Sequence, residues 1–309
     1  VKGVWLSSMD DKGQLKKQSI TQVQAQHTIL AAGAIGSPAV LMRSGLDKLN
    51  PNIGKRTFLH PVTASIAKMP QVVDGYQGAP QSIYSDEFLW RDGISGELGY
   101  KIEVPPLHPV LAATLLRHHG SAHADLMADF KHYQANIALM RDGFNADSQG
   151  GQVSLDKQGY PQLDYPQSDV LWRSLRAAML SMTEMQFAAG AEKVYPLHMD
   201  AKLYSSWSEA SDAIQSLPVK ATRWQIMSAH VMGGCAIGGE NAHQVCGPEG
   251  NLLGVDNLSI LDGSLFPTSL GVNPQLSIYA IAAKLATQLA NKLGGNLPQT
   301  LAEKLKAQG

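Results

Sequence analysis

Alternating apolar and polar positions open the chain. Residues 1–6 and 20–25 alternate as strands do, around a polar turn at 10–13, and this pattern predicts an antiparallel hairpin. The next run, residues 28–32, is apolar on both faces. Such a run is typical of a parallel strand that is buried on both sides of its sheet.

A helix is predicted directly after this run. Gly33 ends the apolar run, Ser37 and Pro38 are suited to the cap and the first turn of a helix, and Gly45 is suited to its end. Strand, glycine turn and helix in this order are typical of an open α/β sheet that binds a ligand at its strand ends.

The middle of the chain has a different pattern. Short alternating stretches broken by Gly, Pro and Asp predict antiparallel strands, at 62–67, 137–140 and 153–155. Helical periodicity is found at 110–117, 123–131 and 170–188. After residue 228 the α/β pattern returns, with a strand at 258–261 and a helix at 274–293.

These changes predict three segments. We expect one α/β domain built from residues 1–60 and 228–309, interrupted by a separate α+β domain with an antiparallel sheet at 61–227. The length of 309 residues leaves room for about two domains.

The composition argues against two classes of binding partner, nucleic acids and membranes. The net charge of −1 gives no electrostatic footprint for nucleic acid or an anionic membrane surface. No apolar run reaches the roughly 18 residues that a membrane-spanning helix needs, so a soluble chain, cytoplasmic or periplasmic, is expected. The compartment stays open, because the chain starts at Val1 and any targeting segment would precede it.

Metal chemistry and disulfides receive little support. His118, His119 and His123 crowd one predicted helix, but no Glu stands between the pair at the right spacing, so a solvated helix face is preferred and no metal site is predicted. Cys235 and Cys246 allow one bridge at most, and small buried side chains are the preferred interpretation.

Candidate chemistry gathers in the last third of the chain. His230 precedes a glycine-rich loop, Asp262 stands in a turn, and Asn273 precedes a proline that can open a helix. Each residue alone fits an ordinary structural role. Together they indicate a site, because a histidine can exchange a proton near neutral pH and a helix amino terminus favours developing negative charge.

Five motifs in order resemble the glucose-methanol-choline (GMC) family of flavin oxidoreductases. They are the run Ala31 to Pro38 with Ser44-Gly45, the segment Ile53-Gly54-Lys55 with His60-Pro61, the His230 loop, the turn Asp262-Gly263-Ser264, and Asn273-Pro274. The second motif has Leu59 where the family often has Asp. The resemblance is closest to the bacterial long-chain alcohol oxidase and cholesterol oxidase branches.

The resemblance implies a reaction. It identifies FAD as the cofactor and an alcohol as the substrate, whose carbon-bound hydrogen leaves as hydride to flavin N5 while His230 accepts the hydroxyl proton. Asn273 matches the second site residue and is expected to orient the alcohol oxygen, because an amide cannot act as a base. An apolar primary or secondary alcohol is expected from the branch resemblance.

The resemblance also implies contacts with FAD. Residues expected against the adenosine half are Ala32, Gly33 and Ala34. Residues expected against the flavin are Asp262, Gly263, Asn273, Pro274 and Gln275. The helix that begins at Pro274 is expected to direct its positive end at the flavin.

One element of the family is not found. No G-x-G-x-x-G run follows a strand and opens a helix, so we expect a partial Rossmann-like, three-layer FAD domain without its amino-terminal strand, turn and helix, joined to an α+β substrate domain. Two alternatives stay open: a lyase of the same fold that uses flavin structurally, and an incomplete fragment without catalysis. The electron acceptor, whether oxygen, a quinone or a cytochrome, stays open too.

Overall fold

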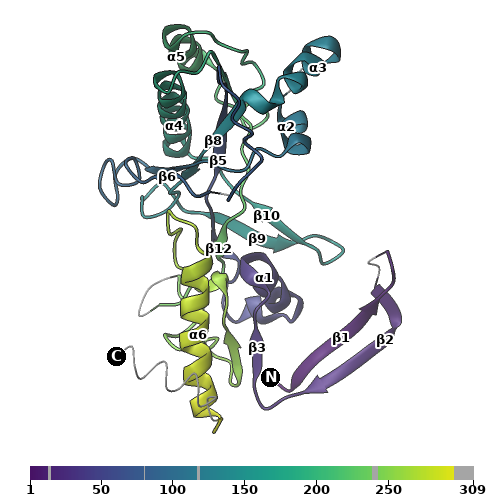
Figure 1. The fold of residues 1–309 in the computed structure, drawn as a ribbon. Coiled ribbons are helices and arrows are strands. Elements are labelled where there is room, and N and C mark those ends of the chain that lie inside the picture. Colours follow the sequence, from purple (N-terminus) through teal and green to yellow (C-terminus); the bar gives the residue numbers. More distant parts are fainter. Residues whose placement is uncertain (13–14, 80, 117–118, 239–242, 296–309) are drawn as a thin grey trace.

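The computed structural model describes residues 1–12, 15–79, 81–116, 119–238 and 243–295. In Figure 1 the elements form two parts, with the helices α2 to α5 in one and α1 and α6 in the other. The two parts meet near the strands β9, β10 and β12.

An antiparallel sheet of five strands forms the centre of the first part. Its order is β11-β5-β8-β7-β6. The strands are β5 (Val62–Lys68), β6 (Tyr84–Ser85), β7 (Tyr100–Glu103), β8 (Tyr133–Met140) and β11 (Lys193–Pro196). The antiparallel strands predicted at 62–67 and 137–140 are thus confirmed as central neighbours in one sheet.

Helices cover this sheet. The helices of this part are α2 (Pro109–Leu115), α3 (Gly120–Ala128), α4 (Asp169–Ala188) and α5 (Trp207–Ser216). The predicted amphipathic helix at 170–188 is confirmed as α4, whose apolar side packs on the sheet and on Trp224. Its first turn is capped by Ser168, whose hydroxyl accepts the N–H of Leu171 at 3.3 Å. The predicted helices at 110–117 and 123–131 correspond to α2 and α3.

A second sheet joins distant parts of the sequence. Its order is β10-β9-β4-β12, formed by β4 (Lys55–Leu59), β9 (Gly151–Leu155), β10 (Pro161–Asp164) and β12 (Val231–Gly233). The antiparallel pairing of β12 with β4 aligns Val231 with Leu59 and Gly233 with Thr57. Strands from before residue 60 and from after residue 228 are therefore neighbours, and β9 and β10 from between them extend the same sheet.

The second part contains a short parallel pair between two helices. Strand β3 (Thr28–Leu30) pairs in parallel with β13 (Leu258–Ile260), and the helices are α1 (Gly33–Arg43) and α6 (Gln275–Lys292). The parallel direction was expected, but burial on both faces was not found, because Ile29 is 49% exposed. In the described residues β3 has no strand partner besides β13, so its other edge is unpaired.

The start of α1 differs from the prediction. The helix begins at Gly33, four residues before the expected cap Ser37, and Pro38 lies inside it. The carboxylate of Asp262 accepts the N–H of Gly33, so a group distant in sequence takes the place of a local cap. The expected end is confirmed, since the helix stops before Gly45, whose φ is +71°.

The predicted hairpin is confirmed at the amino terminus. Strands β1 (Gly3–Met9) and β2 (Leu15–Gln24) pair antiparallel and extend away from the other elements (Figure 1). Short 3₁₀ turns occupy Leu46–Lys48, Phe130–His132 and Gly263–Leu265. Both cysteines are buried and free. No helix within the described residues is long and apolar enough to cross a membrane.

Candidate active site

Two histidines meet where β4 and β12 lie side by side. His60 directly follows β4 and His230 directly precedes β12. Because the two strands run antiparallel, the end of one lies beside the beginning of the other. The Nδ1 atoms of the two rings are 3.0 Å apart, and the rings meet edge to face with their centroids 5.2 Å apart.

The other nitrogen of His60 is also engaged. Its Nε2 accepts the backbone N–H of Gly271 at 2.9 Å, and the His60 side chain is 0% exposed. Gly271 has a φ of +77° and packs against the side chain of Arg141. The His60 ring therefore joins the His230 loop to the loop that precedes α6.

Burial keeps both rings neutral. It lowers the pKa of His60 to about 3, with a smaller contribution from His230. Burial also lowers the pKa of His230, while Glu103 raises it and Lys101 lowers it. A neutral His230 has one ring nitrogen that donates a hydrogen bond and one that accepts.

Asn273 lies between the two members of a buried ion pair. Lys101 Nζ donates to its Oδ1 at 3.4 Å, and its Nδ2 donates to Glu103 Oε2 at 3.5 Å. Lys101 and Glu103 are themselves 3.5 Å apart, and Glu103 is only 2% exposed. These contacts fix which end of the Asn273 amide is oxygen and which is nitrogen.

An apolar pocket of about 230 Å³ opens onto His230. Its floor is the face of the five-stranded sheet that carries Val62, Ala64, Ile66, Ala135, Ile137 and Leu139. Its other walls include Leu107, Leu111 and Leu115 from α2 and the segment before it, together with residues 227–230. The pocket surface is mostly apolar, with the imidazole of His230 at one side.

Strand register explains why charged groups stand beside this apolar floor. Lys101 pairs with Leu139, and Glu103 pairs with Ile137. Residues that pair directly in an antiparallel sheet point to the same face. The ion pair on β7 therefore continues the row of apolar side chains on β8, and Asn273 lies against it.

Several residues expected to contact the cofactor lie at the carboxyl end of the β3–β13 pair. Because the strands are parallel, the segments after them, including Gly33 and Asp262, lie at the same end. One oxygen of Asp262 accepts from Gly33 N at 2.9 Å and from the Ser37 hydroxyl at 2.5 Å, and the other accepts from Ser264 N at 2.8 Å. Both oxygens of the Asp262 carboxylate thus accept hydrogen bonds from other groups of the chain.

The remaining expected residues lie after β3, after β13 and at the start of α6. Ala32 is exposed, Ala34 is buried, and Gly263 lies close to α6, where an added Cβ would be 3.0 Å from Ile278 Cδ1. Pro274 is the residue before α6, and the helix has no side-chain cap and no acidic residue in its first turn. Gln275 is exposed, and its Nε2 donates to the hydroxyl of Tyr279 at 2.6 Å.

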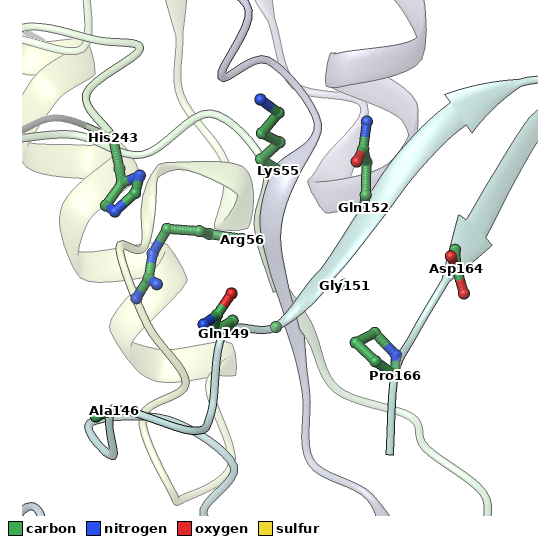
Figure 2. Close-up of a pocket in the computed structure, with 10 residues that line it drawn as sticks. Lys55, Arg56, Ala146, Gln149, Gly151, Gln152, Asp164, Pro166 and His243 are labelled. Atoms are coloured by element: carbon green, nitrogen blue, oxygen red, sulfur yellow. The ribbon is translucent and has the colours of Figure 1, made fainter. Parts of the chain in front are cut away.

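A second, polar pocket of about 500 Å³ lies between β4, β9 and β10 (Figure 2). In Figure 2 the Arg56 side chain extends into the space between His243 and Gln149, and Lys55 points away from it. Neither His230 nor Asn273 lines this pocket, so it is not the expected site. Within the described residues no group of three or more His, Cys, Asp or Glu could hold a metal ion; His118 lies outside them.

The structure brings His230 and Asn273 into one region and adds three residues that the sequence did not assign to the site. His60 belonged to a motif but had no role, and Lys101 and Glu103 stood in a stretch that also resembles the family but had no site role. The alternation of charged and apolar side chains at 100–103 is a weak signal that one face of this strand is polar.

Comparison with known proteins identifies the family. The description "GMC oxidoreductase" matches twice, over residues 1–62 for its amino-terminal domain and 146–282 for its carboxy-terminal domain. The long-chain-alcohol oxidase FAO4A of Arabidopsis thaliana is 30% identical over 281 residues, which cover 86% of this chain and 37% of that protein.

Solved structures share the fold. Pyridoxine 4-oxidase from Mesorbium loti matches with a TM-score of 0.61 at 19% identity, over 88% of this chain and 53% of that one. A variant formate oxidase from Aspergillus oryzae RIB40, studied for modification of its FAD, matches with a TM-score of 0.64 at 15% identity, over 94% and 57%.

The chain therefore spans between about a third and three fifths of these proteins. It matches both domains of one family in chain order, and its fold is that of solved members. The chain belongs to the GMC oxidoreductases, a family of FAD-binding flavoproteins.

Proposed function

We propose that this chain carries the substrate site of an FAD-dependent oxidoreductase acting on the CH–OH group of an apolar primary or secondary alcohol. The observation that carries the proposal is the apolar pocket that opens onto His230, with Asn273 held nearby by Lys101 and Glu103. An alkyl or ring substituent fits the pocket, and the hydroxyl group fits its polar side.

The residues of the second part fit FAD. The first turn of α6 has N–H groups without a side-chain cap or an acidic neighbour, which suits an anionic ring. Apolar surface is open in this part, since Leu276 in the first turn of α6 is 80% exposed and Ile29 in β3 is 49% exposed. Pro274, Gln275 and Gly263 are the residues proposed to hold the flavin, and Ala32, Gly33 and Ala34 the adenosine half.

FAD, His230 and Asn273 have different roles in the proposed reaction. FAD, when bound, supplies the acceptor for the hydride that leaves the alcohol carbon. His230 contacts the hydroxyl group and Asn273 orients its oxygen, both within a region from which the apolar walls exclude water. Lys101 and Glu103 hold the Asn273 amide in one orientation, so its dipole is already aligned when the alcohol binds.

A graded series of linear 1-alkanols tests the apolar pocket. Each additional buried CH₂ contributes about 0.8 kcal/mol, so kcat/KM is expected to rise by up to about fourfold per carbon until the pocket is filled. The variant Ala64→Leu shortens the pocket and moves the plateau to a shorter alcohol. Ala124→Leu, on the exposed surface of α3, serves as the matched control and leaves the series unchanged.

The flavin reaction is tested anaerobically. The purified chain, alone and fused to the part of a GMC relative that it does not match, is mixed with FAD, and loss of the oxidised flavin absorbance is followed after each alcohol is added. Bleaching that is lost in His230→Ala supports the proposal. Binding of FAD without bleaching by any alcohol contradicts it. Release of cyanide from a cyanohydrin while the bound flavin stays oxidised contradicts it as well.

A further inference from the structure

We infer that His60 is a positioning residue that fixes the tautomer of His230, so that His230 presents Nε2–H, a hydrogen-bond donor, to its ligand. The inference concerns the two rings in the resting protein. Only its meaning for the alcohol rests on the function proposed above.

The first step is the backbone N–H of Gly271. It donates to Nε2 of His60 at 2.9 Å, and the His60 side chain is fully buried. A nitrogen that accepts a hydrogen bond in this way carries no proton itself. Since a buried neutral imidazole has one proton, that proton is on Nδ1.

The second step is the contact between the rings. His60 Nδ1 lies 3.0 Å from His230 Nδ1, which is hydrogen-bond distance. With the proton on the His60 side, Nδ1 of His230 is the acceptor. A neutral His230 whose Nδ1 accepts must carry its own proton on Nε2.

The alternatives each leave buried donors opposed. If His230 carried a proton on Nδ1, either as the other tautomer or as an imidazolium, the two N–H groups would point at each other across 3.0 Å. Reversing the His60 tautomer would instead oppose its Nε2–H to the N–H of Gly271. A buried donor without an acceptor is costly, so the observed chain of hydrogen bonds has one consistent arrangement of protons.

The charged groups around His230 do not disturb this arrangement. Glu103 and Lys101 are the groups whose charges act on it, with opposite effects on its pKa. They form an ion pair with each other at 3.5 Å, so their fields partly cancel at the ring. The protonation pattern is therefore set by the contacts of His60.

The consequence concerns the alcohol oxygen. A donor at Nε2 holds the alcohol oxygen by a hydrogen bond, and because Nδ1 already accepts from His60, this form of His230 has no free ring nitrogen to accept the hydroxyl proton. This differs from the role expected from the family resemblance, in which His230 accepts the hydroxyl proton. His230 in the resting form thus holds the oxygen through an N–H group.

Nitrogen-15 NMR of the full chain reads the tautomer directly. Couplings between the ring nitrogens and the ring carbon-bound protons distinguish protonated from unprotonated nitrogen in each of the 10 histidines, and His230 is assigned from the spectrum of His230→Gln. In the neutral form Nε2–H is expected to exceed Nδ1–H by about tenfold or more. An unprotonated Nε2 in the wild-type chain overturns the inference.

Two variants of His60 separate its two hydrogen bonds. Asparagine places an amide nitrogen near the position of Nδ1 and can still donate to His230. Glutamine places an amide oxygen near the position of Nε2 and can still accept from Gly271. His60→Asn is expected to keep the His230 tautomer, whereas His60→Gln is expected to give a mixture.

The result is independent of the proposed reaction. An unchanged tautomer in folded His60→Gln, or an equal change in both variants, contradicts the positioning role. If neither variant folds, the wild-type spectrum alone decides the tautomer. Because the spectra are recorded without FAD or alcohol, a failure of alcohol oxidation with an Nε2–H tautomer contradicts the proposed function and leaves the tautomer in place.

Discussion

The backbone N–H of Gly33 donates to the carboxylate of Asp262 at 2.9 Å, across 229 positions of the sequence. The bond ties the first turn of α1 to the end of β13. Ser37 donates to the same oxygen, and Ser264 N donates to the other. A single buried carboxylate thus receives three donors, two from α1 and one from the turn after β13.

Asp262→Asn is expected to destabilise the chain by roughly 1–3 kcal/mol. Both carboxylate oxygens accept hydrogen bonds, so whichever one becomes an NH₂ group faces a donor. Urea unfolding measures the effect. Asp256→Asn, at an exposed carboxylate, is the matched control and changes stability by less than about 0.5 kcal/mol. Equal stability of the two variants would contradict the role of this carboxylate.

The stability contributed by His60 depends on pH. Its pKa is about 3 in the folded chain and about 6.5 when unfolded, so the unfolded chain binds the additional proton between these values. The contribution is complete above pH 6.5 and is lost progressively as the pH falls toward 3, amounting to a few kcal/mol, on the order of 5 at most.

The comparison of wild-type with His60→Gln isolates this contribution. Other carboxylates and histidines titrate in the same range, but they do so in both chains. The difference in unfolding free energy between the two chains is expected to shrink as the pH is lowered from 7 to 4. A difference that is constant with pH would show that His60 titrates normally in the folded chain.

Much of the fold could be predicted from local patterns. The hairpin, the antiparallel strands, α4 and α6 follow from periodicities within single segments, where the buried face of each element is written in its own sequence. The start of α1 could not be predicted in this way. Ser37 looks like a cap, yet its hydroxyl donates to Asp262, 225 positions away.

The candidate site depends still more on contacts that are distant in sequence. His230 and Asn273 stand in motifs, whereas the contact of His60 with His230 follows from the pairing of β4 with β12. The polar side of the pocket follows from the register of β7 on β8, which places Glu103 beside Ile137. Register between strands is set by the whole sheet.

Gly271→Ala is expected to destabilise the chain for two reasons. The φ of +77° is unfavourable for a residue with a side chain, and the new Cβ would lie 2.6 Å from Cγ of Arg141. The expected loss is roughly 2–4 kcal/mol. Gly159→Ala is the matched control, because Gly159 has a φ of +84° with open space around it and carries the backbone penalty alone.

The same substitution has a second consequence. Movement of residue 271 away from Arg141 shifts the N–H that His60 accepts, so the preferred tautomer of His230 is expected to weaken together with the stability. Thermal unfolding and the histidine NMR spectrum check the two effects. If Gly271→Ala is no less stable than Gly159→Ala, the close contact with Arg141 does not constrain this loop.

Opposite shifts in the pKa of His230 are expected from substitutions on the two sides of its ion pair. Glu103 raises this pKa and Lys101 lowers it, so Glu103→Gln is expected to lower it and Lys101→Met to raise it. Lys101→Met leaves the buried Glu103 carboxylate without its cation, whereas Glu103→Gln leaves Lys101 paired with Asp86 at 3.8 Å, and the stability cost of each is measured separately by urea unfolding. NMR titration of His230 gives the pKa in each chain, and Lys202→Met, at an exposed lysine paired with Glu209, is the control that leaves it unchanged. Shifts of the same sign in Glu103→Gln and Lys101→Met would mean that altered burial, and not charge, governs the ring, because a change in solvent access moves the pKa in one direction whichever partner is removed.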